Sequence, residues 1–348
     1  MEKFTLLAEN AVTMNNKIYC ICKDFAVLFS INMDDGMIEI IGNLPKEKFF
    51  LKQSCRKIIN YENRLIFVPY NAKYIHIYDI KNNNWTEIEY PDNESEGYKY
   101  IEGLVYNNKV IMIGACAKNI IELDMSSYEV KIINTYFGKY DKFIDLFCRS
   151  GFAIVDNYLY VALAVSNEVI KINLDSYAFD VVKVGNESYS GITFDGKTFW
   201  LTPRRGNNVV KWDGVGETEK INLPFSQEKD KCNYGGVYLA NNKIYLHGFE
   251  GKFSAVIDEN GICHVDKNTY IFFRDIENDD VIGQTRKGTI ILYESGEKKF
   301  FDCNIDRKKL DEFILRLDDF SLFQNNDSFI SETELYELKM YLGYLCNT

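Results

Sequence analysis

One two-strand pattern recurs six times along the chain and constrains its fold more than any other feature. In each copy an apolar pair follows a turn, and a polar residue ends the next strand at the same offset from the first member of the pair. The pairs begin at Ile18, Leu65, Val110, Leu159, Phe199 and Ile244, and the polar residues are Asn32, Asp79, Asp124, Asn173, Asp213 and Asp258. The interval from one copy to the next varies between roughly 40 and 50 residues. Because the offset is fixed while the interval varies, the pattern predicts a constant hairpin whose connections change in length.

Each copy has room for four strands. The fourth copy of the pattern, for example, contains the runs GFAIVDN, YLYVALAV, EVIKINL and AFDVVKV. Such runs are typical of short antiparallel strands separated by turns. Four such strands in a repeat of roughly 40 to 50 residues form one blade of a β-propeller. A less regular seventh copy starts at Val281, and its offset to Glu294 is shorter by one position. The sequence therefore predicts an all-β, seven-bladed propeller over residues 1–306, with six blades as the alternative.

The second copy states the pattern most fully, as RLIFVPYNAKYIHIYDIKNNNWTE from Arg64 to Glu87. Together with NNKIY in the first copy it resembles Kelch-type repeats, and FDGKTFWLT resembles strands of many bacterial propellers. Kelch repeats usually carry a Gly-Gly pair after the first anchored strand, where this chain has Pro69-Tyr70, Gly114-Ala115 or Pro203-Arg204. The resemblance extends over the repeated part of the chain and implies a propeller fold.

The apolar spacing changes after residue 306. Apolar residues then lie three and four positions apart, as Phe313 and Ile314 do from Leu310, which predicts an amphipathic helix. Ser331 and Glu334 fit a capping box at the start of a second helix. Residues 307–348 are thus predicted to form a two-helix extension that packs on the propeller, or that contacts a partner or a second copy as a homodimer.

Charge and composition exclude several classes of protein. A net charge of −11 argues against nucleic acid and anionic membranes as partners, because both require a basic face. The start of the chain lacks the long apolar region of a cleavable signal, so a cytoplasmic location is expected. Nine scattered cysteines favour buried, reduced thiols over a disulfide framework. Their spacing and that of the three histidines predicts no metal site, and no motif indicates a cofactor.

Arginines gather at the predicted binding face. In a propeller the start of each innermost strand and the loop between the second and third strands lie on the same face. Six of the nine arginines fall at such positions, namely Arg56, Arg149, Arg204, Arg205, Arg274 and Arg286. The predicted ligand-binding residues are Arg56, Tyr70, Glu102, Arg149, Tyr189, Arg204, Arg205, Tyr234, His247 and Arg274. Guanidinium groups bind carboxylates and phosphates through two parallel hydrogen bonds. The alternative is that these arginines pair with Glu102 and other acids, or only solvate loops.

Three functions remain open from the sequence. The absence of a nucleophile elbow and of a phosphate-binding loop favours a non-catalytic binding propeller whose ligand is a peptide, a protein or an anionic small molecule or glycan. The second is a lyase, hydrolase or cyclase acting on a small or sugar-like substrate, which predicts that Tyr189, Tyr234, His247 and an arginine converge on one point. The third is a scaffold that associates through the C-terminal helices.

Overall fold

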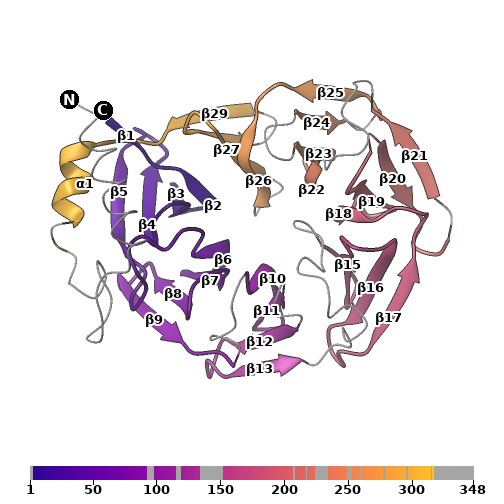
Figure 1. Ribbon diagram of the computed structural model, residues 1–348, viewed down its shortest axis with the longest axis horizontal. Helices are drawn as coiled ribbons and strands as arrows, with labels where there is room; N and C mark the ends of the chain where they lie inside the picture. The colour runs from indigo at the N-terminus through magenta and orange to yellow at the C-terminus, as the bar shows by residue number, and fades with distance from the viewer. Residues whose placement is uncertain are drawn as a thin grey trace, which may run out of the picture.

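The structure, a computed structural model, is a ring of seven four-stranded antiparallel sheets (Figure 1). It describes residues 3–91, 98–114, 119–133, 152–206, 208–216, 218–223, 234–248, 253–258, 260–276, 280–294, 297–314 and 316. The prediction of seven blades is confirmed, and the six-bladed alternative is wrong. In every blade the strands follow chain order from the centre of the ring, which we call the channel, to the rim.

The blades follow one another along the chain. Blade 1 is β2 (Ala8–Met14), β3 (Lys17–Cys22), β4 (Val27–Asn32) and β5 (Ile38–Asn43). Blade 2 is β6 (Cys55–Tyr61), β7 (Arg64–Pro69), β8 (Ile75–Asp79) and β9 (Asn84–Ile88). Blade 3 is β10 (Tyr100–Tyr106), β11 (Lys109–Gly114), β12 (Ile120–Asp124) and β13 (Val130–Ile133). Blade 4 is β14 (Ala153–Val155), β15 (Tyr158–Ala162), β16 (Glu168–Asn173) and β17 (Phe179–Lys183).

The second half of the ring continues in the same order. Blade 5 is β18 (Tyr189–Phe194), β19 (Phe199–Pro203), β20 (Asn208–Trp212) and β21 (Thr218–Asn222). Blade 6 is β22 (Tyr234–Ala240), β23 (Lys243–Gly248), β24 (Ser254–Ile257) and β25 (Cys263–Asp266). Blade 7 is β26 (Tyr270–Ile276), β27 (Asp280–Thr285), β28 (Thr289–Glu294) and β29 (Glu297–Asp302).

The pairing of the middle strands explains the constant offset found in the sequence. In blade 1 Ile18 pairs with Ile31, and the first apolar residue of each later copy pairs at the same separation up to blade 6. In blade 7 Val281 pairs with Tyr293, one position closer. The hairpin of blade 7 is therefore shorter than the others, which accounts for its shorter offset in the sequence.

The polar residue that ends the third strand caps the turn that follows it. Its side-chain oxygen accepts a backbone N–H two residues on in five of the six copies and three residues on at Asp79. The Asn32 Oδ1 to Asp34 N distance is 2.8 Å, for example. Asn and Asp can form this turn because their short side chains reach their own backbone. The repeat thus reflects turn chemistry as well as strand pairing.

A separate pair of strands and one buried glutamine close the ring. β1 (Lys3–Thr5) pairs with β30 (Asn304–Asp306), so the two ends of the propeller lie side by side. Gln284 in blade 7 is fully buried and accepts a hydrogen bond from the Ala8 N–H at 2.6 Å. It also donates to Leu6 O at 2.9 Å. The four strands of blade 7 all lie between Tyr270 and Asp302, and none of them is taken from the N-terminal part of the chain.

The predicted first C-terminal helix is present as α1 (Arg307–Ile314). Leu310 is buried in an apolar cluster with residues of blades 1 and 7, and the Phe313 ring lies 6.4 Å from the Phe49 ring. The second predicted helix, which begins near Ser331, lies outside the described residues. Among the described residues no helix is long and apolar enough to cross a membrane. Five of the nine cysteines are described, and all five are free thiols: Cys20, Cys22, Cys55, Cys263 and Cys303.

Candidate functional site

A β-bulge near the start of the innermost strand shapes the channel in six blades. The residue before the bulge is buried, as Tyr189 and Tyr234 show with none of their surface exposed. The Tyr189 hydroxyl donates to Val184 O at 2.6 Å. Both tyrosines belong to the apolar clusters between blades. We therefore assign these two predicted ligand-binding residues to the core.

The bulged residues of blades 1 and 2 form the first charged pair at the channel. Glu9 is 3% exposed and accepts a hydrogen bond from Arg56 Nη1. The Arg56 guanidinium also lies 5.6 Å from the centre of the Tyr70 ring, which stacks on Tyr98 at 4.4 Å. Arg56 Nε is buried and has no hydrogen-bond partner among the described residues. One donor of this guanidinium is therefore uncommitted within that part of the chain.

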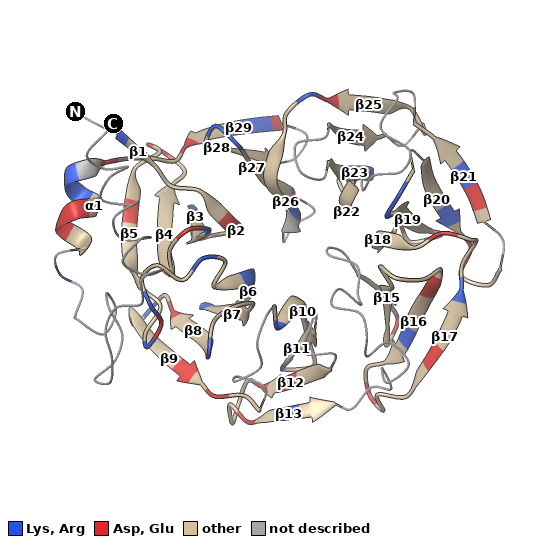
Figure 2. Ribbon diagram, viewed as in Figure 1, with Lys and Arg blue, Asp and Glu red and all other residues tan. Residues whose placement is uncertain are grey.

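A second charged group crosses the channel. Glu102 in blade 3 lies 2.6 Å from Lys57 Nζ in blade 2 and 2.8 Å from Arg274 Nη1 in blade 7. Burial alone raises the pKa of Glu102, but Lys57 and Arg274 outweigh it and lower the pKa to about 2. Figure 2 shows the positions of basic and acidic residues on the inner strands β2, β6 and β26. The Glu102 contacts tie together three blades, and blade 7 is a neighbour of neither of the other two in the ring.

His247 in blade 6 adds a neutral group to this charged centre. Burial, with the nearby Arg274 and Arg56, lowers the pKa of His247 to about 3. Its ring binds the backbone of Tyr270, and its Nε2 atom is buried without a hydrogen-bond partner in the described structure. Since a neutral imidazole has one donor and one acceptor nitrogen, bonding of Nδ1–H to the Tyr270 carbonyl leaves Nε2 as an acceptor.

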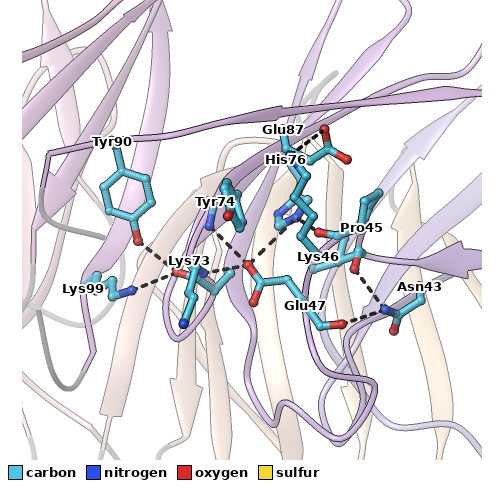
Figure 3. Close-up of polar contacts among 12 residues, drawn as sticks. Asn43, Pro45, Lys46, Glu47, Lys73, Tyr74, His76, Glu87, Tyr90 and Lys99 are labelled. Atoms are coloured by element: carbon cyan, nitrogen blue, oxygen red, sulfur yellow. Dashed lines mark hydrogen bonds and ion pairs between the residues drawn. The ribbon is translucent and has the colours of Figure 1, made fainter. Parts of the chain in front are cut away.

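A buried polar cluster holds the loop that carries Tyr70 (Figure 3). Glu47 Oε1 accepts the backbone N–H groups of Lys73 at 2.6 Å and Tyr74 at 3.2 Å. Lys99 donates through its backbone to Tyr70 O at 2.9 Å and through its side chain to Ala72 O at 3.1 Å. These contacts fix both ends of the loop, so the Tyr70 ring is positioned beside Arg56 before any ligand arrives.

Two titratable groups in this cluster have shifted pKa values. Burial raises the pKa of Glu47 to about 7, although the backbone donors from Lys73 and Tyr74 oppose it. Burial lowers the pKa of His76 to about 4. His76 Nε2 lies 3.0 Å from Pro45 O, and the whole side chain is inaccessible to solvent. His76, inside the third strand of blade 2, is therefore a structural residue.

The ten predicted site residues separate into four groups. Arg56, Tyr70, Glu102, His247 and Arg274 belong to the charged centre described above. Tyr189 and Tyr234 are core residues. Arg204 donates to Ala164 O at 3.2 Å and Arg205 is exposed, whereas Arg149 lies outside the described residues. Arg286, the remaining one of the six arginines predicted at this face, is exposed on the turn between β27 and β28. The predicted alternative, pairing of arginine with Glu102, holds for Arg274.

Two residues of the centre were missed from the sequence. Glu9 precedes Arg56, and Lys57 precedes Glu102, by the same intervals that separate the first apolar residues of the corresponding copies. Aligning the copies would therefore have placed Glu9 beside the predicted Arg56, and Lys57 with the predicted Glu102. No cluster of three His, Cys, Asp or Glu side chains suited to a metal ion occurs among the residues that the structure describes.

Sequence comparison identifies no relatives. No protein-family model matches the chain, and no curated protein matches it significantly. Solved structures do resemble it, although their sequences differ from it at most positions.

Three solved propellers illustrate the range of that likeness. Virginiamycin B lyase from Staphylococcus aureus shares 14% identity at a TM-score of 0.62, covering 85% of this chain and 96% of its own. A protein assigned as a putative 6-phosphogluconolactonase from Bacteroides fragilis shares 14% at 0.56, covering 87% and 95%. The computationally designed protein Ika8 shares 10% at 0.56, covering 87% and 89%. The chain thus has the fold of a seven-bladed propeller, and neither Kelch-type repeats nor a particular chemistry follows from that likeness.

Proposed function

We propose that this protein is a binding propeller whose channel mouth holds a small hydroxylated carboxylate, such as an acidic sugar. The observation that carries the proposal is the pair of buried nitrogens, Arg56 Nε and His247 Nε2, that no described residue hydrogen-bonds. They come from different blades and lie close enough for the Arg56 charge to depress the pKa of His247. Arginine offers donors to a carboxylate, and a neutral imidazole nitrogen accepts a hydroxyl proton.

The charge balance of the channel supports an anionic ligand. Among the described residues that form the two groups, the cations are Arg56, Lys57 and Arg274, and the acids are Glu9 and Glu102. Three cations against two carboxylates leave one net positive charge, although the chain as a whole carries −11. A local positive centre attracts anions even where the overall charge is negative.

Calorimetric titration with matched sugars tests this proposal. We expect D-glucuronate or D-galacturonate to bind, and the uncharged D-glucose and D-galactose to bind at least ~10-fold more weakly. Arg56→Met should reduce uronate affinity by about 10-fold or more, because it removes the charged donor. His247→Phe should also weaken binding, by removing the acceptor at similar volume.

Lys299→Met is the matched control, since Lys299 lies on the outer strand of blade 7 and pairs with Glu294. Its affinity for uronates should equal that of the wild type. Failure of both uronates to bind, or equal binding by the wild type and Arg56→Met, would contradict the proposal.

The enzyme alternative is supported by one observation, the acceptor character of His247 Nε2 inside a charged centre. A pKa near 3 makes this imidazole a weak base at neutral pH, and proton transfer is most efficient near the working pH. Tyr189 and Tyr234, which this alternative placed at the same point, are buried in the core. Turnover of a uronate during the titration, lost in His247→Phe, would establish the enzyme instead.

A further inference from the structure

A cavity of about 500 Å³ lies between blades 6 and 7, apart from the residues of the channel site. Its volume falls in the usual range for small-molecule sites. Lys243, which lines it, begins β23, and Asp258 follows β24. These are the strand ends opposite the channel mouth, where Tyr234 begins β22. The cavity therefore lies toward the other face of the ring.

Strand register gives the cavity an aromatic floor. In blade 6 Tyr245 pairs with Val256, and Val256 pairs with His264, so these three side chains share one face of the sheet. In blade 7 Tyr293 pairs with Lys298 in the same way. The Tyr245 and Tyr293 rings lie 5.7 Å apart at 67°. Two tyrosine rings and one valine thus provide an apolar surface that a flat ring can contact.

A hydrogen-bonded carboxylate fixes this floor. Asp266 Oδ2 lies 2.7 Å from the hydroxyls of both Tyr270 and Tyr293, and the two hydroxyls are also 2.7 Å apart. Burial raises the pKa of Asp266, but the donors Tyr293, Tyr270 and the Asn268 backbone outweigh it and lower the pKa overall. Asp266 is therefore a charged acceptor already satisfied by the protein, and it holds the Tyr293 ring in place.

The other charged side chains of the cavity differ in whether the protein supplies them with a partner. Asp258 accepts two backbone N–H groups of its own turn and lies 3.1 Å from His264 Nε2. Lys298 lies over the Tyr293 ring at 4.9 Å and makes no ion pair among the described residues. Lys243 likewise forms no ion pair within the described part of the chain. Asp258 and Asp266 keep their negative charges, and the Lys298 ammonium helps to lower the pKa of Asp266. The cavity thus holds two ammonium groups and two carboxylates, and it is the ammonium groups that lack an ion pair among the described residues.

We propose that this cavity is a second ligand site, for a small aromatic carboxylate. The aromatic ring contacts Tyr245, Tyr293 and Val256, and the carboxylate lies between the amino groups of Lys243 and Lys298. Lysine binds anions as a point charge, so the site selects for charge and for flatness rather than for one carboxylate geometry. This inference is independent of the uronate site, because the two share no residue.

A titration of the full chain with benzoate, monitored by ligand-observed NMR, tests this proposal. We expect a dissociation constant of about 1–10 mM for so small a ligand, and at least ~10-fold weaker binding of benzamide, which has the same shape without the charge. The double variant Lys243→Met, Lys298→Met should lose at least ~10-fold in benzoate affinity, and each single variant should lose part of that.

Two control variants show whether benzoate occupies this cavity or binds elsewhere on the protein. Lys299→Met removes a neighbouring lysine that pairs with Glu294, and Arg56→Met removes the channel arginine. Benzoate affinity should be unchanged in both. No benzoate binding at 20 mM (roughly twice the weakest expected dissociation constant), equal affinity in the wild type and the double variant, or loss of binding in Arg56→Met would each overturn the proposal. If neither uronate binds while benzoate binds as expected, only the proposal for the channel site is overturned.

Discussion

Glu47 shows how one buried carboxyl can link pH to stability. Its pKa is raised to about 7 in the folded chain, mainly by burial, against about 4.3–4.5 when unfolded. A raised carboxyl pKa means that the folded state holds the proton more tightly than the unfolded state. The stability from this group is therefore fully present below about pH 4.5 and is lost as the pH rises through 7.

Glu47→Gln should remove this dependence. Between pH 4.5 and 8 the wild type should lose up to ~3 kcal/mol relative to Glu47→Gln, because a shift of one pKa unit corresponds to about 1.4 kcal/mol. Urea unfolding of both proteins at four pH values measures the difference. Glu39→Gln is the control, since Glu39 is 61% exposed at its side chain. A stability difference between Glu47→Gln and the wild type that stays constant with pH would show that Glu47 is not the titrating group.

Only part of the channel site could be predicted residue by residue. Arg56 and Tyr70 could be predicted to lie close together, because the start of the inner strand and the following hairpin loop share a face. The pairing of Glu102 with Arg274 joins residues 172 positions apart, and no local pattern specifies which blades face each other across a ring. The burial of Tyr189 and Tyr234 could not be predicted, because a bulge changes which side chain points inward, and a bulge has no strong signature in the sequence.

At the scale of single elements, turn chemistry specifies the strands as much as hydrophobic alternation does. In FDGKTFW the Asp195 carboxylate accepts the N–H groups of Lys197 at 2.8 Å and Thr198 at 2.7 Å, and the Trp200 Nε1–H at 2.6 Å. Gly196 follows with a φ of +91°, which a side chain would resist. The turn, and with it the register of β18 and β19, is thus held by four consecutive residues and one indole.

Asp195→Ala should destabilise the protein by about 1–2 kcal/mol, because two backbone donors and the partly buried Trp200 indole lose their acceptor. Asp195→Asn keeps an acceptor oxygen and should cost much less. Denaturant unfolding measures both, and Trp200 fluorescence gives a local signal. Equal losses in the two variants would show that the charge, and not the acceptor, stabilises this turn.

For the whole molecule, the architecture could be predicted because it is repeated. Six equal offsets specify a hairpin, and the intervals between copies specify a blade. The number of blades in the ring then follows from the length of the repeated region divided by the length of one repeat. The way in which the ring closes could not be predicted. Gln284 reaches Leu6 and Ala8, 278 and 276 positions away, and nothing near Gln284 in the sequence identifies those partners.

Gln284→Leu should open this closure. It removes the side-chain partner of the buried Ala8 N–H and of the Leu6 carbonyl, which should cost about 2–5 kcal/mol. Thr202→Val is the matched control, since Thr202 is equally buried in the second strand of blade 5 and its hydroxyl has no partner among the described residues.

Hydrogen exchange provides the spatial readout for this pair of variants. In Gln284→Leu, protection should fall at residues 4–12 and in blade 7 before it falls in blade 5. Thr202→Val should leave the whole pattern close to that of the wild type. Uniform loss of protection around the ring in Gln284→Leu would mean that the closure is no weaker than the other contacts between blades.

Because the first and last blades share none of the described strands, every blade is one uninterrupted stretch of sequence. A tandem duplication or deletion of one such stretch in the gene would add or remove a whole sheet and leave the others covalently intact. Descendants of such a chain can therefore change their number of blades in single genetic steps. The seam made by Gln284 and the β1–β30 pair needs to be inherited only once, at the two ends of the repeated region.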